Sequence, residues 1–136
     1  EGKKLPKAQL LIYPVTDLTF TSDSVEELAE GFFLTKEVMY WFRDKYLEAE
    51  ESFKDPLISP LFAKDLSHQP PAVVVTAGFD VLRDEGEAYA KLLKSFDVET
   101  YYHEYQGYIH GFVNMEMVKG VNDSIIEFCN DFKKIN

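Results

Sequence analysis

An aspartate and a histidine that each follow an apolar, strand-like run are the side chains best suited to joint acid–base chemistry. Asp80 follows the run at 72–77, and His110 follows the run at 98–105. If these runs are neighbouring parallel strands, both side chains lie at the carboxyl edge of the sheet, where α/β proteins gather reactive groups. There the aspartate can accept a hydrogen bond from the imidazole and stabilise the imidazolium that forms when the ring takes a proton. The alternatives are a helix-capping aspartate and a merely exposed loop histidine.

The other titratable candidates are expected to have structural or surface positions. Asp84 and Glu85 compete with Asp80 for the acid role, but they stand where the next helix should begin, which suits capping and the helix dipole. His68, in a proline-rich connection, and His103, within the third strand, are expected at the surface. No group of His, Asp or Glu has the spacing of metal ligands, so no metal site is predicted.

Three strand-like segments predict a parallel sheet. The runs at 9–13 and 72–77 have the apolar density of buried strands, the first is expected to be a central strand, and residues 98–105 are expected to form a third strand. Segments long enough for a helix separate the runs, as crossover connections between parallel strands require. The expected fold class is therefore α/β, with right-handed crossover helices.

Helical spacing of apolar residues predicts the segments between the strands. Thr35 is expected to cap the second helix, and Asp123 or Ser124 the last. The proline-rich stretch 48–71 is expected to be a packed, irregular connection. The expected helices cover residues 25–30, 36–47, 84–96 and the segment from the last cap to about 133.

Composition limits the classes of partner. The 136 residues fit one domain, and 24 acidic against 14 basic side chains give a net charge of -10, which disfavours binding to nucleic acid or anionic lipid. No run approaches the roughly 18 apolar residues of a membrane span. Cys129 is the only cysteine and cannot form an internal disulfide, so a reducing, cytoplasmic location is predicted.

Five segments carry a family resemblance. In chain order they are QLLIYP at 9–14, GFFLT at 31–35, DPLISPL at 55–61, TAGFDVLRDEG at 76–86 and HGF at 110–112. Together they resemble the hormone-sensitive-lipase-like family of α/β-hydrolase esterases. The resemblance implies that Asp80 is the catalytic acid, that His110 is the general base, and that the strands are the sixth to eighth of the hydrolase sheet. Val81 stands where the family usually has proline, which makes the turn less rigid.

The nucleophile of that family is not found in this sequence. Neither a Gly-x-Ser-x-Gly elbow nor a His-Gly-Gly stretch occurs between Glu1 and Asn136. In the family the serine precedes the acid and the base, so we expect residues 1–136 to be the C-terminal half of a single hydrolase domain. The missing N-terminal segment, carrying the serine and the oxyanion hole, is thus an expected partner, and the isolated chain is predicted to be inactive.

The resemblance implies a carboxylesterase or lipase-type serine hydrolase that acts on small ester substrates and needs no cofactor. Met39, Trp41 and Phe42 on the second helix, and Phe112 beside His110, are candidates for the substrate pocket. Core packing is the alternative for the three helix residues, and packing of the loop is the alternative for Phe112. The last strand is a candidate homodimer edge. Two other hypotheses are a non-catalytic hydrolase-fold receptor and an independent acidic interaction domain.

Overall fold

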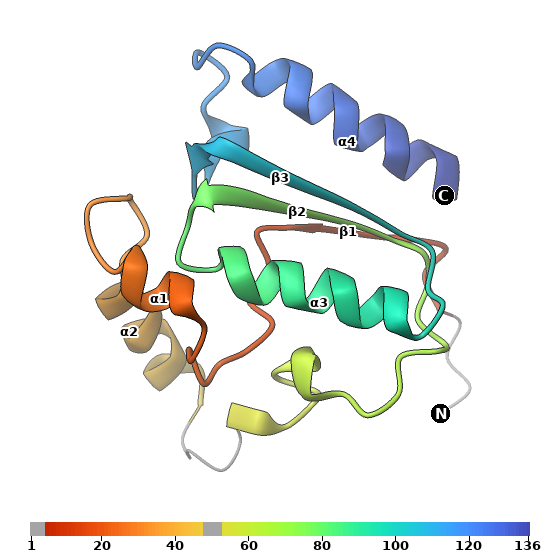
Figure 1. The fold of residues 1–136 in the computed structure, drawn as a ribbon, viewed down its shortest axis with the longest axis horizontal. Coiled ribbons are helices and arrows are strands. Elements are labelled where there is room, and N and C mark those ends of the chain that lie inside the picture. Colours follow the sequence, from red (N-terminus) through yellow and green to blue (C-terminus); the bar gives the residue numbers. More distant parts are fainter. Residues whose placement is uncertain (1–4, 48–52) are drawn as a thin grey trace.

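A parallel, three-stranded sheet forms the centre of the molecule (Figure 1). The computed structural model describes residues 5–47 and 53–136. The strands β1 (Gln9–Ile12), β2 (Ala72–Phe79) and β3 (Thr100–Ile109) lie in the order β1-β2-β3, and both pairings are parallel. The predicted α/β class with crossover helices is therefore confirmed.

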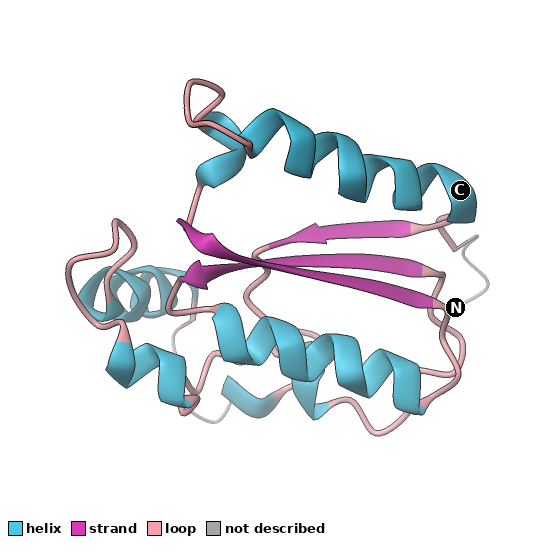
Figure 2. Cartoon of the chain, turned by 45° about the horizontal axis from the view of Figure 1, so that its top comes forward, coloured by secondary structure: helices cyan, strands magenta, loops and turns pink. Residues whose placement is uncertain are grey.

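Two long helices cover opposite faces of the sheet (Figure 2). On one face, α3 (Arg83–Ser95) buries Leu93 against Val74 of β2. On the other face, α4 (Val121–Ile135) buries Phe128 against Val73 and Val75. Successive residues of a strand point to opposite faces, so β2 is enclosed on both sides, as its continuous apolar run predicts.

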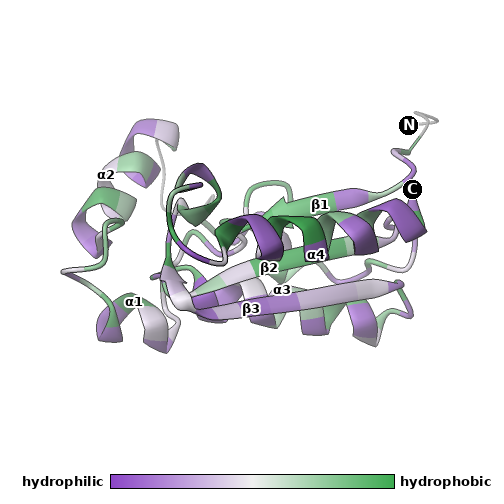
Figure 3. Ribbon diagram, turned by 90° about the horizontal axis from the view of Figure 1, so that it is seen from above, coloured by the Kyte–Doolittle hydropathy of each residue, from purple (hydrophilic) through white to green (hydrophobic). Residues whose placement is uncertain are grey.

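The two edge strands, β1 and β3, are less buried than the central strand β2. Within the described residues β1 pairs with β2 alone and its residues are half-buried; its expected central position refers to the eight-stranded sheet of a whole hydrolase domain. Figure 3 shows β1 and much of β2 as hydrophobic, whereas β3 is mostly hydrophilic or neutral. The central position in this sheet therefore belongs to β2.

Two short helices lie beyond the carboxyl ends of the strands (Figure 1). Helix α1 (Asp23–Glu27) begins and ends earlier than expected. Helix α2 (Lys36–Tyr46) matches its prediction, and the Thr35 hydroxyl accepts a hydrogen bond of 3.2 Å from the Val38 N–H, as an N-cap does. Leu18, Phe20, Val25, Leu28, Met39, Val81 and Leu82 form the apolar cluster that joins these helices to the start of α3.

Helix α4, two short 3₁₀ turns and the proline-rich connection complete the described structure. Helix α4 begins after Gly120, which has φ +89°, so neither Asp123 nor Ser124 is its cap. Short 3₁₀ turns occur at Pro60–Phe62 and Phe112–Asn114. Leu66 is buried beneath α3 and Leu61 packs beside it, but Leu57 is 93% exposed, so the described part of the proline-rich connection is packed only in part. Residues 48–52 of that prediction lie outside the described residues.

Gly78 marks the closest approach of β2 and β3. A Cβ atom at this position would lie 2.5 Å from the Cα and carbonyl oxygen of Gln106. The register between the strands is irregular here, between Ala77 and Phe79. The absent side chain lets the two backbones touch just before Asp80 and His110.

Gly78→Ala is expected to lower the free energy of unfolding of the full-length protein by about 1–3 kcal/mol, because two backbones must separate to admit one methyl group. Gly107→Ala is the matched control, because a Cβ atom at Gly107 meets nothing within 4 Å. Denaturant unfolding of both variants measures the difference. Equal stabilities would contradict the predicted clash.

Candidate functional site

Asp80 and His110 lie together at the carboxyl edge of the sheet. Asp80 directly follows β2, His110 directly follows β3, and the His110 Nδ1 lies 2.8 Å from the Asp80 Oδ2. The Asp80 side chain is 1% exposed, and that of His110 is 22% exposed. With the carboxylate as acceptor, Nδ1 carries the ring proton and Nε2 is free to accept another. An imidazole held in this way can act chemically as a general base.

The turn after β2 binds the second carboxylate oxygen of Asp80, the one that does not contact His110. Asp80 Oδ1 accepts a hydrogen bond of 3.0 Å from the Leu82 N–H, and the Asp80 carbonyl accepts one of the same length from the Arg83 N–H. Val81 is fully buried in the cluster beneath α1 and α2. Burial of this valine and the two hydrogen bonds therefore fix the turn without a proline.

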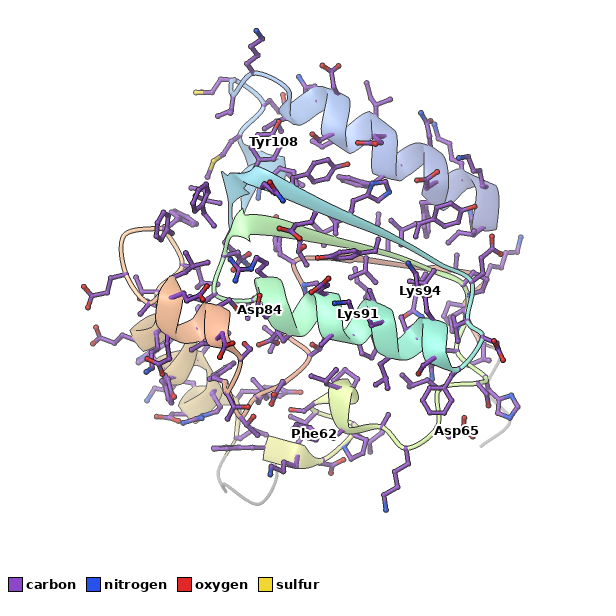
Figure 4. The ribbon with its side chains drawn as sticks, in the orientation of Figure 1. Phe62, Asp65, Asp84, Lys91, Lys94 and Tyr108 are labelled. Atoms are coloured by element: carbon purple, nitrogen blue, oxygen red, sulfur yellow. The ribbon has the colours of Figure 1, made fainter. Side chains whose placement is uncertain are left out.

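The turn after β3 is packed by aromatic rings. The Tyr108 ring, near the end of β3 in Figure 4, stacks on Phe112 with centroids 4.9 Å apart. Gly111 has φ +81°, a conformation that glycine adopts without strain, and it turns the chain back toward α4. The stack and the tight turn thus fix the segment of backbone that carries His110.

Tyr13 is a site residue that the sequence analysis did not identify. Its ring centroid lies 4.3 Å from that of His110, and its φ of +39° is unusual for a non-glycine residue. Burial, and then the negative charge of Asp80, raise the pKa of the Tyr13 hydroxyl. Tyr13 follows β1, so the strand-end argument applied to all three strands would have found it.

A largely apolar cavity of about 670 Å³ opens beside His110. The segment after β1, α2 and the start of α3 form its walls. The guanidinium of Arg43, which lines the cavity, lies over the ring of Tyr40 at 4.5 Å. The lining residues are Ile12, Tyr13, Val15, Leu18, Phe20, Leu34, Met39, Phe42, Arg43, Tyr46, Ile58, Leu82 and His110.

Two of the four pocket candidates reach this cavity. Met39 and Phe42 line it, whereas Trp41 and Phe112 do not. Successive helical residues point about 100° apart, so Trp41 projects away although its ring contacts that of Phe42. Phe112 is 1% exposed and packs between the sheet and α4 with Val73 and Phe128, because the turn at Gly111 sends it there.

Asp84 and Glu85 have structural contacts, but neither caps α3: the N-cap is Leu82, without a side-chain cap hydrogen bond, and the two carboxylates bind other segments instead. Figure 4 shows Asp84 at the start of α3. Its carboxylate accepts hydrogen bonds from the Ser24 N–H at 2.8 Å and from Arg83 at 2.7 Å. Burial raises the pKa of Asp84, but these hydrogen bonds outweigh burial and hold it below its ordinary value. Glu85 is buried and binds the segment after β1.

The surface prediction is right for His68 and wrong for His103. His68 is exposed. The His103 side chain is only 13% exposed, and its Nε2 lies 2.9 Å from the Asp131 Oδ2. Helix α4 covers this face of β3 and supplies the aspartate. The molecule therefore has a second His–Asp pair, which does not line the cavity.

Three smaller features concern metals, membranes and thiols. Within residues 5–47 and 53–136, no three His, Cys, Asp or Glu side chains are grouped so that they could hold a metal ion. Among those same residues, no helix has the length and apolar character needed to cross a bilayer. Cys129 is a free thiol, half-buried on α4 beside the core.

Comparison with known proteins finds the same architecture in ester hydrolases. Residues 1–114 match a family model described as alpha/beta hydrolase fold. The carboxylic ester hydrolase LipN of Mycobacterium tuberculosis is 40% identical over 121 residues, which cover 88% of this chain and 32% of that protein. The chain spans about a third of the length of the curated relatives it matches.

Solved structures agree closely with this chain. A hyperthermophilic esterase from Pyrobaculum calidifontis has a TM-score of 0.90 at 39% identity, covering 98% of this chain and 45% of that one. An ester hydrolase from the metagenome of Lake Arreo, in complex with a bipyridine phosphonate derivative, has a TM-score of 0.83 at 39% identity. That match covers 97% of this chain and 44% of the other.

Proposed function

The chain belongs to the hormone-sensitive-lipase-like esterase family of the α/β-hydrolase fold, and from this premise we propose that it supplies the acid and the base of a serine carboxylic ester hydrolase. The observation that carries the proposal is the 2.8 Å contact between Asp80 Oδ2 and the Nδ1 of His110, a residue that lines an apolar cavity. Asp80 is assigned the acid role and His110 the general-base role.

The proposed reaction is acyl transfer from an ester to water. His110 Nε2 takes the proton of a serine hydroxyl as the serine oxygen bonds to the ester carbonyl carbon. The tetrahedral intermediate then expels the alcohol, which receives that proton from His110, and an acyl-serine remains. His110 next takes a proton from water, the resulting hydroxide displaces the serine oxygen, and the proton returns to the serine. Asp80 holds the ring in one tautomer throughout.

The serine itself is proposed to come from polypeptide outside residues 1–136. None of the seven serines in the sequence has a glycine two residues to each side, as a nucleophile elbow requires. The chain would then be the C-terminal part of one catalytic domain and would be inactive alone. The apolar lining of the cavity favours esters with an uncharged acyl or alkoxy group.

The test uses the full-length polypeptide that contains this sequence. It is incubated with p-nitrophenyl acyl esters and, separately, with an alkyl phosphonate ester that reacts with activated serines. We expect ester hydrolysis, and a phosphonate adduct on a serine outside residues 1–136. An adduct on a serine within these residues would refute the assignment of the nucleophile. If neither ester hydrolysis nor an adduct is observed, that outcome favours the receptor hypothesis instead.

Two adjacent aromatic residues of α2 test whether the cavity binds the substrate. In the full-length enzyme, Phe42→Ala is expected to raise KM for esters large enough to fill the cavity by about tenfold, because an apolar contact is lost. Trp41→Ala is the matched control: Trp41 is 56% exposed against 55% for Phe42, but only Phe42 lines the cavity. Steady-state kinetics on a series of acyl lengths would measure the effect, and equal effects of both variants would argue against this cavity.

A further inference from the structure

Glu85 is a fully buried carboxyl group with no part in the proposed acyl transfer. It lies in the first turn of α3 and is 1% exposed. Its Oε1 accepts hydrogen bonds from the Thr16 N–H at 2.6 Å and the Asp17 N–H at 3.0 Å. In return the Thr16 hydroxyl donates to the Glu85 carbonyl at 2.9 Å. Three hydrogen bonds thus join α3 to the segment after β1.

The segment that Glu85 holds forms a wall of the candidate site. Tyr13, Val15, Leu18 and Phe20, on both sides of the two bonded residues, line the cavity. Tyr13 also packs against the His110 ring at 4.3 Å. A shift of the segment relative to α3 would therefore move the cavity wall and a neighbour of the base together.

The surroundings of Glu85 disfavour its charged form. The nearby charges are the carboxylates of Asp17, on the bonded segment, and Asp80, at the end of β2. On its own helix, Arg83 is paired with Asp84 and with Glu27 of α1. Among the described ion pairs, none includes Glu85.

One carboxyl oxygen is buried without a partner. Within the described part of the chain, Glu85 Oε2 accepts no hydrogen bond. A buried charge in this position would cost far more free energy than a neutral O–H group. Burial above all, opposed by the two backbone N–H groups and aided by Asp17 and Asp80, raises the pKa of Glu85 from 4.5 to about 8.

We propose that Glu85 is a positioning residue: as a neutral carboxylic acid it clamps the cavity-lining segment after β1 to α3 and so sets the shape of the substrate cavity. The inference rests on the proposed esterase function for that cavity. Ionisation places a negative charge between two other carboxylates and loosens the clamp. Because the folded-state pKa is raised, the stabilisation is complete below pH 4.5 and is lost as pH rises from 4.5 through about 8.

The experiment compares Glu85→Gln, Glu85→Ala and the control Glu87→Gln in the full-length protein. Glutamine keeps an acceptor for the two N–H groups and stays neutral at every pH, whereas alanine leaves both N–H groups unpaired. Glu87 lies on the same helix, but it is partly exposed and paired with Lys91. The measurements are Tm and the kinetics of p-nitrophenyl ester hydrolysis at pH values that bracket 4.5 and 8.

We expect Tm of the wild type and of E87Q to fall as pH rises through this interval, and Tm of E85Q to stay nearly level. Well below its Tm, E85A should lose about 10- to 100-fold in kcat/KM, mainly through KM for cavity-filling esters, and E85Q should restore most of the loss. A role in stability alone would lower Tm of E85A without moving KM.

Three results would overturn the clamp. The first is an E85A protein with a lowered Tm but an unchanged KM, the second is an E85Q protein whose Tm falls with pH as steeply as that of the wild type, and the third is an E85Q protein as impaired in KM as E85A. If the wild type hydrolyses no ester, the esterase proposal fails, together with the assignment of Glu85 to an esterase cavity. In that case, a Tm of E85Q that does not change with pH would still support a contact between α3 and the segment after β1 that is made by an uncharged Glu85 carboxyl group.

Discussion

His110→Asn in the full-length protein is expected to lower kcat for ester hydrolysis by about four to six orders of magnitude. Asparagine has no nitrogen that can take the serine proton, so nucleophilic attack loses its base. KM should change little, because the apolar walls of the cavity remain. Kinetics on a p-nitrophenyl ester, at a temperature below the Tm of every variant, would measure the loss.

The second His–Asp pair provides a control matched in chemistry. His103 lies on β3, the strand that His110 follows, and it contacts its aspartate at nearly the same distance. It is mostly covered, but it faces α4 and not the cavity. His103→Asn should leave kcat close to that of the wild type and affect only stability. If both variants lost the same rate, or if His110→Asn kept the wild-type rate, His110 would not be the base.

Asp80→Asn is expected to lower kcat by about 10⁴-fold. The asparagine oxygen can still accept the hydrogen bond from the Leu82 N–H, so the turn after β2 should persist. The amide N–H would then face His110 Nδ1, favour the tautomer with its proton on Nε2, and remove the free electron pair that the serine proton needs. The measurement is kcat, with circular dichroism to verify that the fold is retained.

Asp131→Asn is the corresponding control, because Asp131 binds His103 and Lys134 and does not contact the cavity. The double variant Asp80→Asn with His110→Asn gives a sharper criterion. If the two residues act as one unit, the double variant should be no slower than His110→Asn alone. Multiplicative losses would show that Asp80 acts independently of the histidine.

Local sequence determined the elements and the placement of the candidate pair. The run at 72–77 became the buried central strand, and Thr35 capped α2, because strand burial and capping depend on contiguous residues. Asp80 and His110 met because strands joined by crossover helices run parallel and bring their carboxyl ends to one edge. The meeting of these two strand ends depends on the order of the elements and not on their packing.

Contacts between segments far apart in the sequence decided the side-chain partners and the burial of individual residues, which no local sequence pattern encodes. The partner of His103 lies 28 residues away on α4, and that of Glu85 lies 69 residues away after β1. Phe112 is buried in the core beneath α4, whereas Met39 lies in the cavity wall. Which of the two reaches the cavity depends on which helix covers each face of the sheet. Side-chain partners and charge states depend on desolvation by remote segments, so only the tertiary structure decides them.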